Sequence, residues 1–170
     1  MTTKTSSSKI KVGYDLYTKL LNNLQSPLLL ALRLYWGWQF FVTGKGKLLN
    51  LDQTTDYFTQ LGLPFPHLNA VMAGSTECFC GLLLLVGLGS RLISVPLIVT
   101  MIVAYFTAEQ EAVSMIFSNP DGFVTATPFL FLLASVIVLV FGPGKFSLDT
   151  LIGSFFQRSD STVVELKRAA

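Results

Sequence analysis

Four long apolar stretches alternate with polar segments along this chain of 170 residues. Each stretch is close to the roughly 20 residues that a helix needs to cross the hydrocarbon core of a bilayer. The pattern therefore predicts an all-α, integral membrane four-helix bundle. Its expected spans cover about residues 26–43, 67–88, 91–108 and 121–141.

Amphipathic patterns flank these spans. Between residues 10 and 24, apolar residues recur at helical spacing and polar residues fill the other face, which predicts a helix on the membrane surface. An ordinary solvated helix end is the alternative. After the fourth span, Gly142-Pro143-Gly144 breaks the helix, Ser147 is an expected N-cap, and a second surface stripe follows. This second stripe consists of Leu148, Leu151, Ile152, Phe155 and Phe156.

These patterns divide the chain into three regions. Residues 1–25 form a polar tail, disordered over 1–8, and the first interfacial helix. Residues 26–142 form the membrane domain, and residues 143–170 form the second interfacial helix and a polar C-terminal tail. In the first loop of the membrane domain, Tyr57, Phe58 and Leu61 form a short apolar face that we expect to dip into the outer interface.

Basic residues predict the orientation of the spans. Lys and Arg precede the first span, occupy the second loop and follow the fourth span, whereas the third loop carries Glu109, Glu111 and Asp121 without any Lys or Arg. Only Lys45 and Lys47, in the first loop, run against this trend. Because cytoplasmic loops carry an excess of Lys and Arg, we expect both termini in the cytoplasm and a multi-pass protein of the inner (cell) membrane.

Composition removes several function classes. Charged residues make up 13% of the chain, against about 25% in soluble domains, and the mean hydropathy is +0.58. The net charge of +2 does not suggest a nucleic-acid partner. One histidine and two cysteines support neither a metal site nor a disulfide framework. Cys78 and Cys80 lie on different sides of a helix and cannot pair with each other within it. We expect no signal peptide and no covalently bound cofactor.

Two charges fall inside the apolar stretches, Arg33 in the first and Glu77 near the middle of the second. A charge at membrane depth costs a few kcal/mol or more, so it needs a partner or a function. Small residues share the face of each charge, which allows close helix packing. The sequence therefore predicts an Arg33–Glu77 ion pair, serving either as a structural lock or as the polar end of a ligand or proton pocket. The small residues are Gly37, Gly44, Gly74 and Gly81.

Other residues complete the candidate site. Trp36, one turn from Arg33, either walls a pocket or fills space between helices, and Gln39 is a further buried polar group. Lys47 and Asp149 are expected to anchor the two interfaces, and Arg91 to begin the third span. In that span, one helical stripe consists of Pro96, Thr100, Ala104, Thr107 and Glu111. The favoured role of this stripe is helix packing and hydrogen bonding to the backbone.

The motifs resemble the DoxX family of small four-helix membrane proteins over about residues 28–150. They are RLYWGWQFFVTGKGKL (33–48), LGLPFP (61–66), AGSTECFCGLLLLVGLGSRL (73–92) and GPGKFSLD (142–149). The family pattern maps onto Arg33, Gly37, Gly44, Lys47, Glu77, Gly81, Gly87, Arg91, Gly142, Gly144, Ser147 and Asp149.

The resemblance implies redox work, because a related subunit belongs to a thiosulfate:quinone oxidoreductase and other members are linked to oxidative-stress complexes. Thr43 and Glu109 stand where the family often has histidines, which counts against histidine-based chemistry. The leading hypothesis is a membrane redox subunit that binds a quinone or similar lipid-soluble partner at Arg33 and Glu77.

Alternatives to this hypothesis stay open. One is a non-enzymatic scaffold for a soluble redox or stress-response enzyme, and a small-molecule carrier ranks last. Electrons would come from a partner or a diffusible ligand. The expected partners are the lipid bilayer, together with a soluble redox enzyme, a second membrane subunit or another copy of the chain.

Overall fold

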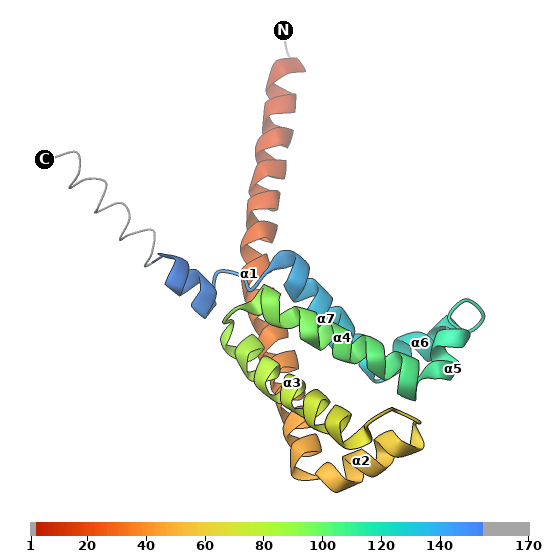
Figure 1. The fold of residues 1–170 in the computed structure, drawn as a ribbon. Coiled ribbons are helices and arrows are strands. Elements are labelled where there is room, and N and C mark those ends of the chain that lie inside the picture. Colours follow the sequence, from red (N-terminus) through yellow and green to blue (C-terminus); the bar gives the residue numbers. More distant parts are fainter. Residues whose placement is uncertain (1–2, 155–170) are drawn as a thin grey trace, which may run out of the picture.

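A computed structural model describes residues 3–154 and contains only helices and their connections in this range (Figure 1). A further helical segment covers residues 148–154. The named elements are α1 Thr3–Leu49, α2 Leu51–Gln60, α3 Pro66–Val86, α4 Ser90–Ala108, α5 Gln110–Ser114, α6 Pro120–Thr125 and α7 Pro128–Phe141.

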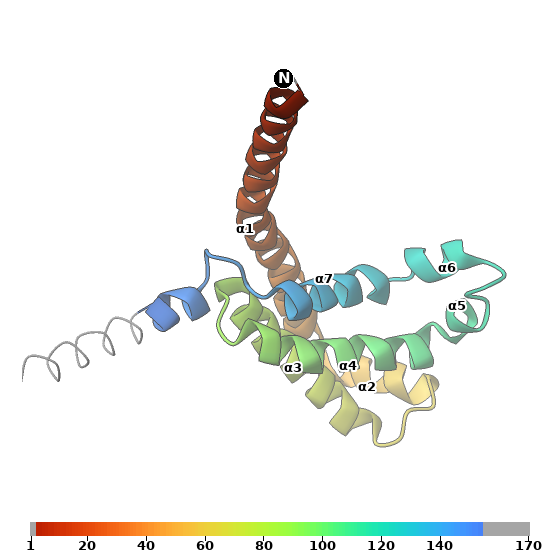
Figure 2. The same cartoon turned by 90° about the horizontal axis from the view of Figure 1, so that it is seen from above.

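Helix α1 is continuous over 47 residues, so the expected start of a new helix at Pro27 is wrong. Residues 3–8, expected to be disordered, are helical as well. The helix passes through Pro27, where the backbone N–H of Lys145 donates to the Ser26 hydroxyl at 3.4 Å and braces this turn against the C-terminal segment. Figures 1 and 2 show the N-terminal part of α1 projecting away from the other helices.

Helices α1 and α3 pack directly through their glycines. A Cβ atom added to Gly37 would lie 2.8 Å from the Leu85 backbone nitrogen, and one added to Gly81 would lie 2.6 Å from that of Phe41. A side chain at Gly44 would likewise collide with the backbone of Cys78. The predicted close approach through small residues is therefore confirmed, and it fixes an antiparallel register between the two helices.

A tight turn at Gly87 and Gly89, both with positive φ, leads from α3 into α4, which packs beside α7. The apolar core between these helices consists of Phe40, Leu84, Ile93, Leu97, Met101 and Val138. Among the described residues, α3 and α4 are long and apolar enough to cross a membrane, and α7 is a shorter apolar helix.

The predicted fourth span, 121–141, is interrupted. Helix α6 ends at Thr125, Ala126 adopts an extended conformation with ψ of 140°, and α7 begins at Pro128. The physical reason is Pro128, which has no backbone N–H for the carbonyl four residues earlier and whose ring disfavours a continuous helix. A break thus lies inside the predicted span.

The predicted N-cap at Ser147 and the helix after it are confirmed as far as the described residues reach, and the position of this helix on the membrane surface stays a prediction. Ser147 caps the segment 148–154, because its hydroxyl accepts a hydrogen bond from the Thr150 backbone N–H at 3.2 Å. Of the predicted stripe, Leu148, Leu151 and Ile152 are exposed, whereas Phe155 and Phe156 lie outside the described residues.

Candidate functional site

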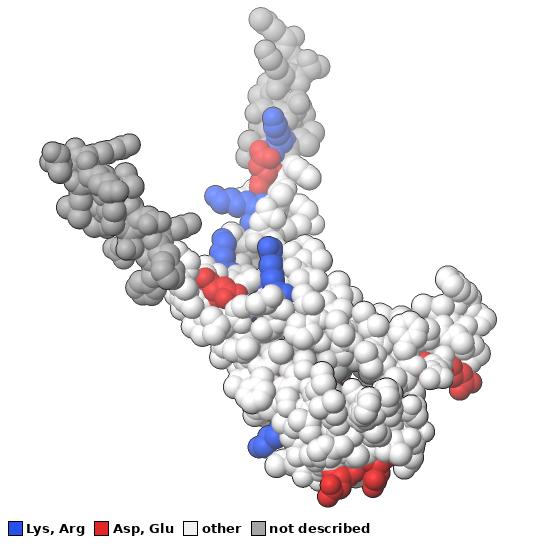
Figure 3. Space-filling view, in the orientation of Figure 1, with Lys and Arg blue, Asp and Glu red and all other residues white. Residues whose placement is uncertain are grey.

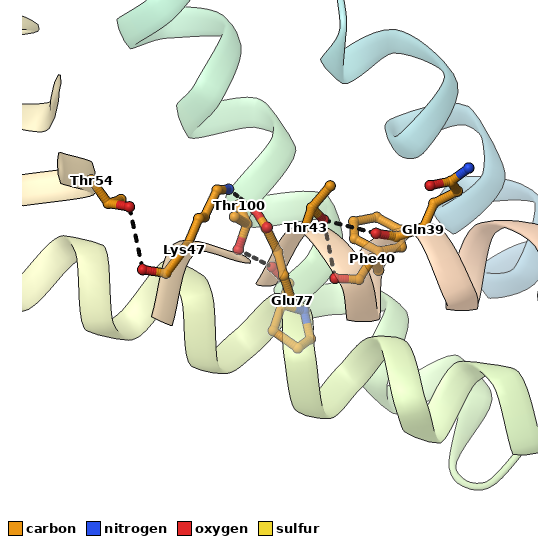
Figure 4. A network of polar contacts seen from close by, with 8 residues as sticks. Gln39, Phe40, Thr43, Lys47, Thr54, Glu77 and Thr100 are labelled. Atoms are coloured by element: carbon orange, nitrogen blue, oxygen red, sulfur yellow. Dashed lines mark hydrogen bonds and ion pairs between the residues drawn. The ribbon is translucent and has the colours of Figure 1, made fainter. Parts of the chain in front are cut away.

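An ion pair between the half-buried Lys47 and the buried Glu77 joins the end of α1 to the middle of α3. The Lys47 ammonium lies 2.5 Å from a carboxylate oxygen of Glu77 (Figure 4). The Glu77 side chain is 2% exposed and that of Lys47 33% exposed. The hydroxyl of Thr54 on α2 donates to the Lys47 carbonyl at 3.3 Å, which holds α2 against this end of α1.

The predicted ion pair between Arg33 and Glu77 is wrong. Arg33 lies about 21 Å along the axis of α1 from Lys47, from a rise of about 1.5 Å per residue. The antiparallel register explains this separation, since Gly44 meets Cys78 and each step back along α1 corresponds to a step forward along α3. Lys47 is therefore level with Glu77, and Arg33 is level with the end of α3.

Arg33 is instead enclosed by the C-terminal segment. Its side chain is 1% exposed, and its guanidinium donates to the Phe146 carbonyl at 2.5 Å. Gly87 leaves the space that the guanidinium occupies, because an added Cβ atom would collide with it. This arrangement buries a cation among loop backbone atoms, and Arg33 lines neither of the two cavities described below.

Asp149 completes the closure of this end. Its carboxylate accepts hydrogen bonds from the backbone N–H groups of Gly89 at 2.7 Å and Ser90 at 3.0 Å, so it caps the start of α4. Its own N–H donates to the Gly87 carbonyl at 3.0 Å. Arg91 donates to the Val140 carbonyl at 3.3 Å. Arg33 thus ties α1, and Asp149 the α3–α4 turn, to the segment after α7, while Arg91 ties the start of α4 to the end of α7.

The Lys47–Glu77 pair, by contrast, lies in the wall of a cavity of about 840 Å³. Helices α2, α3 and α4 form its walls, and the start of α7 contributes Pro128. The lining is mainly apolar, which suits a lipid-soluble molecule. Its polar members are Lys47, Gln53, Thr54, Tyr57, Asn69, Thr76, Glu77, Thr100, Thr107, Glu109 and Thr127.

Most of the predicted α4 stripe faces this cavity. Pro96, Thr100, Ala104 and Thr107 all line it. The two hydroxyls also bond to their own helix, Thr100 to the Pro96 carbonyl at 2.9 Å and Thr107 to that of Val103 at 2.8 Å, as the favoured interpretation requires. At the outer end, however, Glu109 lines the cavity, whereas Glu111 is exposed on α5.

The first-loop residues have a larger role than their sequence pattern indicated. Tyr57, Phe58 and Leu61, predicted as a short interfacial face, cover one side of the cavity from α2 and the turn after it. Asn69 also lines the cavity, and its side-chain amide donates to the Pro64 carbonyl at 2.5 Å.

Two further candidate residues lie elsewhere. Trp36 and Gln39 line a second pocket of about 620 Å³ between α1 and the α6–α7 connection, where Trp36 packs edge-on against Phe131 with ring centroids 4.9 Å apart. Thr127 belongs to the lining of both pockets. The four predicted ligand residues are therefore separated into three places: Glu77 in the main cavity, Trp36 and Gln39 in the second pocket, and Arg33 in the closed cluster.

Lys47 is the residue whose role the sequence reasoning misplaced. It shares the helical face of Gly37 and Gly44, and an antiparallel register extrapolated from these glycines brings it beside Glu77. The sequence signal for this pair was therefore the α1–α3 register set by the glycines. It is a better guide to the partner of Glu77 than the length of the arginine side chain.

The remaining reactive side chains suggest no second centre. Cys78 and Cys80 are free, half-buried thiols. Across residues 3–154, no group of three or more His, Cys, Asp or Glu side chains could hold a metal ion.

Comparisons with known proteins agree with this architecture. The DoxX family model matches residues 28–110. The "Uncharacterized membrane protein Rv3486" of Mycobacterium tuberculosis is 31% identical over 145 residues, covering 78% of this chain and 86% of that protein. The "Putative oxidoreductase CatD" of Bacillus subtilis is 29% identical over 123 residues, covering 72% and 85%. No solved structure matches. The chain belongs to the DoxX family and is a membrane protein.

Proposed function

We propose that this DoxX-family chain binds a quinone or similar lipid-soluble redox partner in the main cavity, as the membrane subunit of a redox system. The observation that carries the proposal is the position of the Lys47–Glu77 pair, with its buried carboxylate, in the wall of a mainly apolar cavity of about 840 Å³. A ligand of this class has a polar head and an apolar tail, which match the two kinds of lining.

The pair offers complementary contacts to such a head. An ammonium group has three N–H donors, so Lys47 can bind Glu77 and still donate to a ligand carbonyl. A carboxylate accepts several hydrogen bonds, so Glu77 can also receive a ligand hydroxyl. Both contacts act in apolar surroundings, where electrostatic interactions are stronger than in water.

The apolar tail of the ligand can pass between the cavity and the bilayer along α4. Val95, Val99 and Val103 line the cavity and are themselves 48%, 53% and 46% exposed. In a bilayer these side chains contact acyl chains, so a lipid-soluble ligand can enter from the side. The name of the Bacillus subtilis relative, an oxidoreductase, supports the redox assignment.

We propose the same topology as the sequence pattern suggested: four membrane crossings by the middle of α1, α3, α4 and α6–α7, with both termini in the cytoplasm. Figure 3 shows most Lys and Arg side chains toward the end from which α1 projects, while α2 and the α5–α6 region carry acidic side chains. This asymmetry supports the orientation. The acidic residues at the outer end are Asp52, Asp56, Glu109, Glu111 and Asp121.

A binding measurement tests the ligand assignment. We would measure equilibrium binding of a radiolabelled short-tail quinone to the protein in lipid nanodiscs. Glu77→Gln is expected to weaken binding by about tenfold, the equivalent of roughly 1.4 kcal/mol, because it removes a charged acceptor. The matched control is Glu111→Gln, which removes an exposed carboxylate outside the cavity and leaves binding unchanged.

The second pocket supplies a further control. Gln39→Leu alters the pocket beside Trp36 and leaves quinone affinity unchanged if the ligand occupies the main cavity. Loss of binding in this variant with normal binding in Glu77→Gln would move the site to the second pocket.

One observation favours the scaffold alternative. The projecting part of α1 exposes Tyr14, Tyr17, Leu21 and Leu24, with 67%, 59%, 47% and 61% of their surface accessible, beyond the bundle. Such a surface can hold a soluble redox or stress-response enzyme at the membrane. Absence of saturable quinone binding in the nanodisc experiment would favour this function over a ligand site.

A further inference from the structure

The buried carboxylate of Glu77 faces a cavity that extends toward only one end of the helices. On α3 the lining runs from Asn69 to Glu77, and on α4 it runs from Val95 to Ala108 and includes the C-cap residue Glu109. None of the residues 78–94, which include the α3–α4 turn, lines it. The route from Glu77 through the cavity therefore leads toward α5.

The opposite direction is closed by packing. Beyond Glu77, Gly81 packs against Phe41 of α1, and any side chain at position 81 would collide with α1. Phe40 and Leu84 are both 0% exposed and belong to the apolar core. This layer separates Glu77 from the closed cluster around Arg33.

Polar groups continue from the ion pair to the mouth of the cavity. Thr100 lines the same cavity as the Lys47–Glu77 pair and is drawn with it in Figure 4, and Thr107 and Asn69 line the cavity farther toward α5. Both threonine hydroxyls donate to carbonyls of their own helix, so their oxygens remain acceptors for water. The cavity is large and polar enough along this wall to hold water molecules.

Glu109 stands at the end of this row. It is the C-cap residue of α4, is half-buried and lines the same cavity as Glu77. Thr100 and Glu109 are separated by about 14 Å along the helix direction, from a rise of about 1.5 Å per residue. No Lys or Arg occurs between residues 92 and 144, so the local charge at this mouth is acidic and attracts protons.

We propose that Glu77 exchanges protons with one side of the membrane only, the side on which α5 lies, through the water-filled part of the cavity and with Glu109 as the carboxylate at its mouth. A proton arriving at Glu109 passes through water and binds a Glu77 carboxylate oxygen. This neutralises Glu77, releases Lys47 from its ion pair and involves no oxidation or reduction.

The other titratable groups facing the cavity do not provide a competing route. They are Lys47 from α1 and Tyr57 from α2, and α7 contributes only the apolar Pro128. Lys47 is the partner whose attraction the incoming proton must overcome. The inference rests on the proposed membrane topology and does not require that the ligand be a quinone.

The test uses dicyclohexylcarbodiimide, an apolar reagent that adds to protonated carboxyl groups and leaves a mass label on Glu77. The protein is placed in phosphatidylcholine–phosphatidylglycerol vesicles in a Cys78→Ala, Cys80→Ala background with Ser118→Cys. A membrane-impermeant biotin maleimide then marks the molecules whose α5–α6 connection faces outward, and these molecules are captured after solubilisation.

A one-unit drop in external pH is expected to raise Glu77 labelling in the captured molecules by up to about tenfold, the factor by which the proton concentration rises. The same drop inside the vesicles leaves labelling unchanged. Glu109→Gln slows the response to external acid several-fold, whereas the matched Glu111→Gln does not.

Labelling that follows internal pH would overturn the one-sided route, and equal responses of the two variants would remove Glu109 from it. A normal one-sided response in a protein that binds no quinone would contradict the ligand assignment alone.

Discussion

Arg33 and Glu77 are buried to the same extent, each with 1% of its surface exposed, yet their surroundings differ. Arg33 is enclosed by backbone atoms of the segment after α7 and by the turn at Gly87. Glu77 has a partly exposed partner, Lys47, and a cavity beside it. The comparison teaches that burial of a charge in a membrane helix does not distinguish a lock from a site, whereas accessible volume next to the charge does.

The largest effect is expected from Gly87→Ala, which attacks the Arg33 cluster. The new Cβ atom would collide with the guanidinium and lie 2.8 Å from the Ser147 Cβ atom, and Gly87 has a φ of 76°. Steric overlap and left-handed strain together are expected to lower the free energy of unfolding by about 2–4 kcal/mol. Titration with sodium dodecyl sulfate in mixed micelles, followed by circular dichroism, measures this change.

Gly89→Ala is the matched control, because Gly89 has a φ of 61° but open space around its Cα atom. It isolates the backbone strain, about 1 kcal/mol. Equal destabilisation by both substitutions would show that the guanidinium moves freely and that the Arg33 cluster is not tightly closed.

Arg33→Met is expected to have the next largest effect on stability. It leaves the Phe146 carbonyl without its donor and removes the cation near Asp149, so the free energy of unfolding should fall by about 2–3 kcal/mol. Quinone affinity in nanodiscs should not change, since Arg33 does not line the main cavity.

Lys47→Met is the corresponding substitution in the ion pair beside the main cavity. The substitution leaves the Glu77 carboxylate, whose side chain is 2% exposed, without its partner, so we expect a stability loss of about 3 kcal/mol, similar to that of Arg33→Met, but here quinone binding is lost as well. Reversed results, with affinity lost in Arg33→Met and kept in Lys47→Met, would exchange the roles of lock and site.

The contrast also explains what the sequence could predict. Glycines spaced along two apolar helices predicted the α1–α3 contact, and the capping role of Ser147 followed from its position after a helix break. These are local patterns. The partner of Glu77 depended on the register, and the enclosure of Arg33 depended on Phe146, which is more than a hundred residues away in the chain. The partner of Glu77 could be found by extending the register of the glycines to Lys47, whereas the enclosure of Arg33 is not encoded in helical periodicity.

The cavity could not be predicted from the sequence for a similar reason. The apolar face of Tyr57, Phe58 and Leu61 was recognised, but only the fold of α2 over α3 turns it into a wall. Pro128 was visible in the sequence, yet the length of the apolar run outweighed it, and the break between α6 and α7 was missed.

The smallest expected effect tests the position of the ligand within the site. Thr100→Val keeps the side-chain shape and removes a hydroxyl from the wall of the cavity that also holds the Lys47–Glu77 pair. Stability should change by less than about 0.5 kcal/mol, because the lost hydrogen bond runs to the carbonyl of its own helix. Quinone affinity in nanodiscs should fall about twofold to threefold, since the hydroxyl helps to orient water or the ligand head. Thr107→Val, nearer the mouth of the cavity, should leave affinity unchanged. A larger loss in Thr107→Val than in Thr100→Val would place the ligand head toward Glu109 and away from the ion pair.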